Sequence, residues 1–419
     1  MRAYKSIILF KIEPMRIFLV LVIIILLEFY SYIFVQNLTK NKAVHWAYII
    51  INFGAVLYFT YFLLNLDRSK GQNHNTMFIM GILLLMIIPK LIITLLLGFQ
   101  DIMRLLIGTF NKIIQNTTTT FLPDRRKFVS QIAFGMAVIP FLSILYGITK
   151  GKYNFKTLKQ KIFFDDLPDA FDGFRILQLS DLHVGSWDNE EKIKYGIDLI
   201  NQQEVDLIVF TGDLVNSLAN EADPWLDVLK RIKKAPYGNY SVLGNHDYGE
   251  YVRFDTEAEK AANFEAIKNT HPKIGFQLLL NEHIFLNKDG EKIALVGVEN
   301  WGLNFKKAGD LALAGQGLNP DDFKVLLSHD PSHWDAEVVN NPQKYQLTLS
   351  GHTHGMQFGI EIPGWFKWSP VKYIYKQWAG LYQKGKQYIY VNRGFGFHAY
   401  SGRVGIMPEI TILELKKLV

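Results

Sequence analysis

The chain has 419 residues, of which 49% are hydrophobic and 20% are charged, and its formal net charge is +6. It contains no cysteine, which excludes disulfides, thiolate metal ligands and a cysteine nucleophile. Much of the positive charge lies beside long apolar runs, where basic residues usually meet lipid headgroups. A bilayer, and not a nucleic acid, is therefore an expected partner.

Four long apolar runs occupy the first part of the chain. A helix needs about 20 mostly apolar residues to cross a bilayer, and polar connections separate the runs. We therefore predict a multi-pass transmembrane helical region over residues 1–150. Its predicted spans lie near residues 17–35, 44–66, 77–99 and 128–148.

Two ionisable residues, Glu28 and Lys90, fall inside the predicted spans. Charges within a span often mark a path for ions or substrates, and a transporter with a regulatory soluble domain would use them in that way. Such charges also occur at helix–helix contacts, or their side chains reach the headgroups. We favour this second interpretation because the two charges are isolated.

The segment between the third and fourth apolar runs has a less regular sequence pattern. Apolar residues recur at helical spacing after Asp101, which predicts a helix along the membrane surface, and Thr117–Thr120 predicts a loop. The pair Arg125 and Arg126 precedes an apolar run with small residues and resembles a twin-arginine export signal. A basic flank on an ordinary helix is the alternative.

Two conflicting signals bear on the side of the membrane that holds the soluble part. An export signal would place it outside the cytoplasm, whereas the basic residues of the loops favour the cytoplasm. We favour the extracytoplasmic face. Lysines that recur between residues 150 and 161 predict a solvated basic linker over residues 151–170, followed by a soluble domain over residues 171–419.

From Phe174 onward, short apolar runs alternate with helical stretches, which indicates an α/β domain. Five of these runs end in Asp, His or Asn residues, and five of the eleven histidines follow them. The carboxyl ends of strands in an α/β sheet face one rim, so these side chains should meet there. The predicted strands are residues 174–180, 205–211, 240–243, 323–328 and 345–350.

Oxygen and imidazole ligands without thiolates suit divalent Mn, Fe or Zn. Two such ions about 3.5–4 Å apart can bind phosphate oxygens and activate a shared water. No protein nucleophile is evident in the sequence. The pattern therefore predicts two divalent metal ions and hydrolysis of a phosphate ester by a metal-activated water.

The ordered motifs resemble those of the calcineurin-like metallophosphoesterase superfamily, and of its bacterial membrane-associated phosphodiesterases in particular. The resemblance covers residues 174–415 and implies a two-sheet α/β sandwich with flanking helices. The motifs, in chain order, are Asp181-Leu-His183, Gly212-Asp213, Gly244-Asn245-His246-Asp247, His329 and Gly351-His352-Thr353-His354.

The resemblance also implies a role for each of these residues. Asp213 would bridge both ions, His246 would stabilise charge on the phosphate or protonate the leaving oxygen, and Asp247 would orient His246. The ligands of the first ion would be Asp181, His183 and His354, and those of the second would be Asn245, His329 and His352.

The resemblance favours a phosphodiester or phosphomonoester substrate, from a lipid or a cell-envelope molecule. A membrane-bound sensor that binds a phosphate ligand without turnover is the alternative. Outside the motifs, the aromatic and basic segment Trp365–Trp378 either packs on the sheet or meets lipid. His398 and Tyr400 could border the cleft, and Arg393 either contacts phosphate or is structural.

Overall fold

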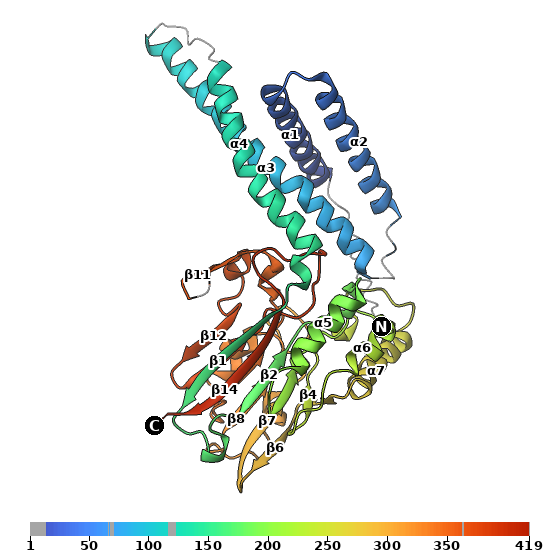
Figure 1. The fold of residues 1–419 in the computed structure, drawn as a ribbon, viewed down its shortest axis with the longest axis vertical. Helices are drawn as coiled ribbons and strands as arrows, with labels where there is room; N and C mark the ends of the chain where they lie inside the picture. The colour runs from blue at the N-terminus through green and yellow to red at the C-terminus, as the bar shows by residue number, and fades with distance from the viewer. Residues whose placement is uncertain (1–13, 66, 68–70, 116–122, 363, 419) are drawn as a thin grey trace, which may run out of the picture. The chain divides into compact units, whose positions relative to one another are not determined.

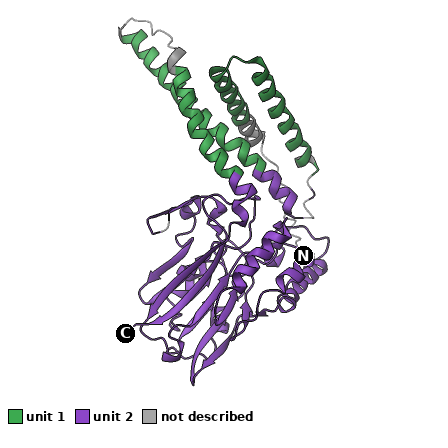
Figure 2. Ribbon diagram, viewed as in Figure 1, with its two compact units in different colours: residues 1–66, 82–145 green, residues 67–81, 146–419 purple. Residues whose placement is uncertain are grey.

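A computed structural model of the chain describes residues 14–65, 67, 71–115, 123–362 and 364–418. The chain divides into two compact units (Figure 2). The first comprises Met1–Leu66 and Ile82–Leu145, and the second comprises Asp67–Gly81 and Tyr146–Val419. The second unit therefore includes the connection between the second and third helices as well as the soluble domain.

Helices form over all four predicted apolar runs. Among the described residues, Lys42–Phe62, His74–Ile114 and Arg126–Thr149 are long and apolar enough to cross a membrane, and the apolar helix Val22–Leu38 is shorter. The helices are α1 (Pro14–Leu38), α2 (Lys42–Leu64), α3 (His74–Phe110) and α4 (Pro123–Thr149).

The helix predicted after Asp101 is present as the continuation of α3. Helix α3 continues without a break through Asp101 to Phe110, and the short π-helix Asn111–Gln115 follows it. The apolar residues at helical spacing therefore extend α3 itself. The predicted loop Thr117–Thr120 lies outside the described residues.

The ionisable residues of the helical unit pair with each other. The ammonium nitrogen of Lys90 lies 2.5 Å from Oε1 of Glu28 and also donates to the side-chain oxygen of Asn52. The hydroxyl of Tyr48 donates to Oε2 of Glu28 over 3.1 Å. The two charges thus join α1, α2 and α3, which agrees with a role in helix–helix contact.

The soluble domain contains two six-stranded sheets (Figure 1). The first has, in spatial order, β1 (Lys156–Phe164), β14 (Glu409–Lys417), β2 (Arg175–Leu179), β3 (Leu207–Phe210), β4 (Asn239–Ser241) and β5 (Gln277–Leu278). The second has β12 (Gly380–Lys384), β13 (Gln387–Val391), β9 (Leu347–Ser350), β8 (Lys324–Leu327), β7 (Glu291–Gly297) and β6 (Glu282–Lys288). All five strands predicted to carry site residues are present.

The sheets pack face to face, which confirms the predicted two-sheet α/β sandwich. Ile176 and Leu207 of the first sheet share one buried apolar cluster with Leu295 and Val325 of the second. The outer face of the first sheet is covered by helices α5 (Glu190–Asn201) and α7 (Glu257–Lys273). Helix α5 buries Ile193, Ile197 and Ile200, whose spacing places them on one side of a helix.

The prediction of a solvated linker over residues 151–170 is wrong for Lys156–Phe164, which form β1. This strand pairs in parallel with β14, from the other end of the domain, along its whole length. Its lysines point to solvent, while Ile162 and Phe164 enter the core between the sheets. Lysines are common on edge strands, and here they obscure the alternation of apolar residues.

Candidate metal centre

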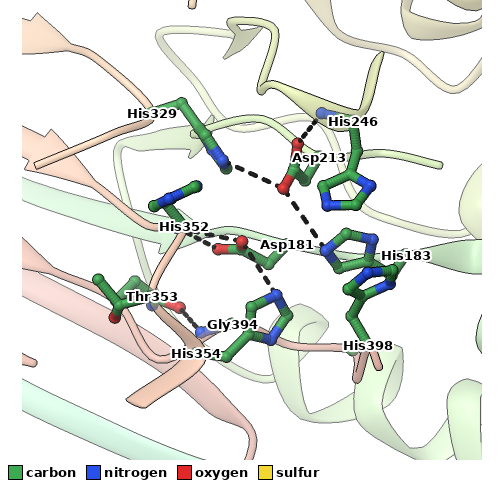
Figure 3. Close-up of polar contacts among 12 residues, drawn as sticks. Asp181, His183, Asp213, His246, His329, His352, Thr353, His354, Gly394 and His398 are labelled. Carbon is green, nitrogen blue, oxygen red and sulfur yellow. Dashed lines mark hydrogen bonds and ion pairs between the residues drawn. The ribbon is translucent and has the colours of Figure 1, made fainter. Parts of the chain in front are cut away.

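The predicted site residues meet at one rim of the sandwich. Strands β2, β3 and β4 are parallel in the first sheet, and β7, β8 and β9 are parallel in the second. The loops after their carboxyl ends bring the functional side chains together (Figure 3). The residues that converge are Asp181, His183, Asp213, Asn245, His246, His329, His352 and His354.

The backbone of these loops is strained. Asp181, His183, Asp213, His352 and His354 all have positive φ angles, between 46° and 71°. A non-glycine residue in this region costs on the order of 1–3 kcal/mol, and such residues cluster at functional sites. The strain accompanies a sharp turn directly after each strand, which keeps the side chains at the rim.

One close approach makes glycine necessary beside the site. A Cβ atom on Gly351 would lie 1.8 Å from Oγ of Ser180 and 2.3 Å from Oδ2 of Asp181. The absence of a side chain therefore lets the loop after β9 reach the carboxylate that follows β2.

Three adjoining groups of described residues could hold a metal ion: one is His183, His246 and His398, and the other two contain the carboxylates. Asp181, His183 and His354 offer ligand atoms within 4.8 Å of one another, and so do Asp213, His329 and His352. Oδ2 of Asp213 connects these two groups, because it lies 3.5 Å from Nε2 of His183 and 3.1 Å from Nε2 of His329 (Figure 3).

The imidazoles of His183, His329 and His354 point Nε2 at these carboxylates. Within the described residues, the buried Nε2 atoms of His183, His329 and His354 have no hydrogen-bond partner, which is costly unless a ligand compensates for it. Nδ1 of His183 lies 3.1 Å from the side-chain oxygen of Asn216, and Nδ1 of His329 lies 2.7 Å from the carbonyl of Thr211. Because these oxygens accept, Nδ1 of each ring carries a proton, which leaves Nε2 as the nitrogen available to a metal ion.

Electrostatics favour a cation between the groups. Burial lowers the pKa of His183 well below its ordinary value. Burial alone would raise the pKa of Asp213, but the facing His329 and His246 hold it well below its ordinary value. Burial also acts to lower the pKa of His329, but Asp213 raises it to about 10. The low pKa of His183, and the ionised carboxylate of Asp213 that needs positive charge beside it, fit divalent metal ions.

Asn245 and His352 lie together, as the predicted second ligand set requires. The side-chain oxygen of Asn245 is 2.8 Å from Nδ1 of His352, and its amide nitrogen donates to the hydroxyl of Tyr251 over 2.6 Å. Nε2 of His352 is 2.8 Å from the hydroxyl of Tyr375. Neither tyrosine carries a recognisable sequence motif.

The prediction that Asp247 orients His246 is wrong. Nδ1 of His246 contacts the backbone carbonyl of Asn216 over 2.7 Å, so this carbonyl orients the ring. The carboxylate of Asp247 instead accepts hydrogen bonds of 2.9–3.3 Å from backbone nitrogens. The donors are Asp213, Leu214, Val215 and Gly244. Asp247 thus fixes the loop that carries Asp213.

Two further residues complete the site. Asn216 contacts Nδ1 of His183 through its side-chain oxygen and Nδ1 of His246 through its backbone carbonyl. In the sequence, only its position three residues after Asp213 indicated such a role. The ring of His398 stacks on His183 with centroids 4.6 Å apart and lies 4.4 Å from His246 (Figure 3). Tyr400, in contrast, is buried and donates to the carbonyl of Gln357.

Arg393 has a structural role. Its guanidinium lies 2.5 Å from the carboxylate of Glu409 and 2.5 Å from that of Glu361. The positive charge is therefore neutralised by two acidic residues, which favours the structural interpretation over phosphate contact.

A two-sheet sandwich with this donor set at its strand ends defines a metal-dependent phosphoesterase. The family described as "Calcineurin-like phosphoesterase" matches residues 174–356, and one described as "Probable Calcineurin-like phosphoesterase, transmembrane domain" matches residues 15–152. The chain belongs to the calcineurin-like phosphoesterase family, as a membrane-bound hydrolase of phosphate esters.

Relatives of known name agree with this assignment. The metallophosphoesterase YkuE of Bacillus subtilis is 34% identical over 60% of this chain and 82% of its own length. The phosphodiesterase YaeI of Escherichia coli is 29% identical over 70% of this chain and 99% of its own. A transmembrane protein with metallophosphoesterase domain from Danio rerio is 26% identical over 67% of this chain and 62% of its own.

Asn216→Ala should weaken metal binding. The variant removes the acceptor that fixes the orientation of His183 and the Nδ1 position of its proton. Loss of such support typically reduces metal affinity by about 10–100-fold. The measurement is the metal content of the purified full-length protein during titration with a chelator.

The matched control is Ser186→Ala, which removes the other donor to the same oxygen of Asn216 and should leave metal affinity nearly unchanged. Equal metal retention by Asn216→Ala and the unsubstituted protein would show that Asn216 does not position His183.

Proposed function

We propose that the protein hydrolyses a phosphodiester or phosphomonoester of a lipid or cell-envelope molecule at a site that holds two divalent ions. The observation that carries the proposal is the position of Asp213. One of its oxygens lies within 3.5 Å of an imidazole nitrogen from each group of ligands. A carboxylate in this position is suited to bridge two ions.

The two groups supply the ligands of the two ions. Ions bound there would polarise the phosphate and lower the pKa of a water molecule, and Mn, Fe or Zn suits the donor set. We assign Asp181, His183 and His354 to the first ion, Asn245, His329 and His352 to the second, and Asp213 to both.

His246 is suited to act on the substrate and not on a metal. Its Nδ1 proton is committed to the carbonyl of Asn216, so Nε2 remains free to donate or accept a proton. Its ring stacks on that of Tyr251, with centroids 4.3 Å apart. This fixed orientation supports a role in which His246 stabilises charge on the phosphate or protonates the leaving oxygen.

A sensor that binds phosphate without turnover is less well supported. Binding alone would not require a histidine that is oriented through Nδ1 and leaves Nε2 free. His246 and the complete set of predicted ligands are all present at the rim, and they favour hydrolysis.

We also propose that α3 and α4 cross the membrane as a hairpin. The start of α3 and the end of α4 both belong to the compact unit of the catalytic domain. Within that unit, the amide of Ser401 donates to the carbonyl of Met77 over 2.9 Å. Because the connection between α2 and α3 packs with the catalytic domain, the two lie on the same side of the membrane. The chain between them must then cross the membrane an even number of times.

The catalytic domain is assigned to the extracytoplasmic face. The arginine pair in the first turn of α4, and the small residues Ala133 and Ala137 further along it, support this orientation. Arg126 makes two hydrogen bonds of 3.2 Å to Asp101, so it also joins α4 to α3.

Chelation should abolish turnover, and Asp213→Asn should be the most damaging change to a ligand. The variant removes the shared negative charge, and with it several kcal/mol of charge stabilisation, so the rate should fall by about 10³-fold or more. The measurements are hydrolysis of an artificial aryl phosphodiester by the full chain and elemental analysis of bound metal.

Asp198→Asn, which alters an exposed carboxylate on α5, is the matched control and should retain both metal and activity. Undiminished turnover by a protein from which all metal has been removed would contradict the two-metal mechanism.

His246→Ala should retain both ions and lose about 10²–10⁴-fold in rate, the usual contribution of acid–base catalysis. The loss should be smaller for 4-nitrophenyl esters than for alkyl esters, because a good leaving group needs little protonation. The measurement is the ratio of rates for the two ester classes, together with metal content.

His283→Ala is the control, because His283 of β6 also contacts a carbonyl through Nδ1 but lies outside the site. A loss of metal from His246→Ala would make His246 a ligand. A uniform loss for both ester classes would assign it electrostatic stabilisation in place of proton transfer.

A reporter that is active only in the cytoplasm should give no signal when fused after Val419. The same reporter inserted between α1 and α2 should give a strong signal, since that connection lies on the opposite face if all four helices cross. A strong signal after Val419 would reverse the orientation and leave the enzymatic assignment unchanged.

A further inference from the structure

An apolar surface projects from the catalytic domain beside its active site. The hairpin of β10 (Ile360–Ile362) and β11 (Phe366–Trp368) extends away from both sheets (Figure 1). In its register, Ile360 faces Trp368 and Ile362 faces Phe366, so these side chains share one face of the hairpin. We define the interfacial surface by its exposed apolar residues, Ile360, Ile362, Trp365, Phe366, Tyr373 and Ile374.

The exposure of this surface requires a partner. Trp365 is 81% exposed, Tyr373 75% and Ile374 64%. Soluble proteins seldom expose a group of large apolar residues unless it contacts another molecule or a membrane. Tryptophan and tyrosine in particular suit the interface between lipid and water, because their rings are both apolar and polar.

The charges around the surface identify the partner as an anionic bilayer. Lys367, Lys372 and Lys376 are exposed, and lysines of this kind are attracted to anionic headgroups. Glu361 is the one acidic residue between Met356 and Trp378, and its carboxylate pairs with Arg393. Apolar and aromatic side chains surrounded by positive charge are typical of segments that lie in the headgroup region.

Backbone hydrogen bonds place the base of the hairpin next to the ends of the membrane helices. Residues 401–404 contact both the start of α3 and the end of α4, and the same residues contact the chain just before β10. The bonds are Ser401 N to Met77 O, Arg403 N to Gly147 O, Val404 N to Gln357 O and Gly359 N to Val404 O, at 2.7–3.2 Å. The hairpin therefore leaves the domain where the helices join it.

The interfacial surface also reaches the metal centre. Ile374 is followed by Tyr375, whose hydroxyl lies 2.8 Å from Nε2 of His352 and donates to Asp330 over 3.3 Å. Met356, two residues after His354, is itself 41% exposed. A membrane in contact with this surface would have its headgroups close to the proposed ligands.

We propose that the interfacial surface docks on the anionic headgroup region of the bilayer that holds the N-terminal helices, and so presents lipid phosphate esters to the metal centre. The docking is inferred from the exposed residues of the interfacial surface, while the lipid substrate rests on the function proposed above.

Because the chain contains no cysteine, a single introduced cysteine can report on docking. Full-length Trp365→Cys, carrying an environment-sensitive fluorophore, is reconstituted in vesicles of phosphatidylglycerol and phosphatidylcholine that contain spin-labelled lipid. The label should be quenched by the lipid, and less strongly in vesicles of phosphatidylcholine alone.

The control is Asp289→Cys in the β6–β7 turn, at the end of the sheet opposite the strand ends that carry the site. Its label should remain in water and unquenched. Equal exposure of the two labels to water overturns the docking. A label at position 365 that is shielded equally in detergent and in vesicles, without lipid quenching, also overturns it and indicates a second copy of the chain.

A functional measurement separates the docking from the substrate. Trp365→Glu should reduce turnover of a vesicle phospholipid relative to a soluble aryl phosphodiester by about tenfold, the scale expected when an interfacial anchor is lost. Leu313→Glu, at an exposed apolar position on α8 (Leu311–Ala314), should leave the ratio unchanged.

The outcomes distinguish the two claims. Quenching at position 365 without any lipid turnover supports the docking and contradicts the lipid substrate. Lipid turnover that Trp365→Glu leaves unaffected, with an unquenched label, contradicts the docking and supports the proposed function.

Discussion

The buried carboxylate of Asp213 is the group on which the rest of the site depends. One oxygen lies between imidazole nitrogens of His183 and His329, and the other accepts the backbone amide of His246. It is only 1% exposed, and an uncompensated charge in such a place would be strongly destabilising. Loops from both sheets therefore converge on this carboxylate, and the sandwich aligns the strand ends that carry them.

The convergence requires conformations that isolated loops would not adopt. Several of the proposed ligands have positive φ angles, and Asp247 holds the Asp213 loop through four backbone amides. The apolar cores on both faces of the first sheet provide the stability that offsets this strain. The acidic residue after His246 therefore fixes the shape of the loop that carries Asp213.

The compact unit of the catalytic domain includes the connection between α2 and α3. The side-chain amide of Asn216 donates to the carbonyl of Gln72, in the connection between α2 and α3, while its oxygen and its carbonyl orient His183 and His246. A residue of this connection, just before α3, thus supports the proposed metal centre from within the same compact unit.

The sequence by itself determined the apolar helices, the five strands and the Asp, His and Asn residues that follow them at one rim, because each of these depends on a local pattern. The tertiary structure decided the features that depend on distant residues. Lys156–Phe164 form a strand because β14 lies beside them. The backbone carbonyl of Asn216, and not the carboxylate of Asp247, contacts Nδ1 of His246, because the geometry of the loops decides which group reaches the ring. The exposure of Trp365 was likewise undecided until the hairpin was placed, since an aromatic segment has the same sequence whether it packs on a sheet or faces a membrane.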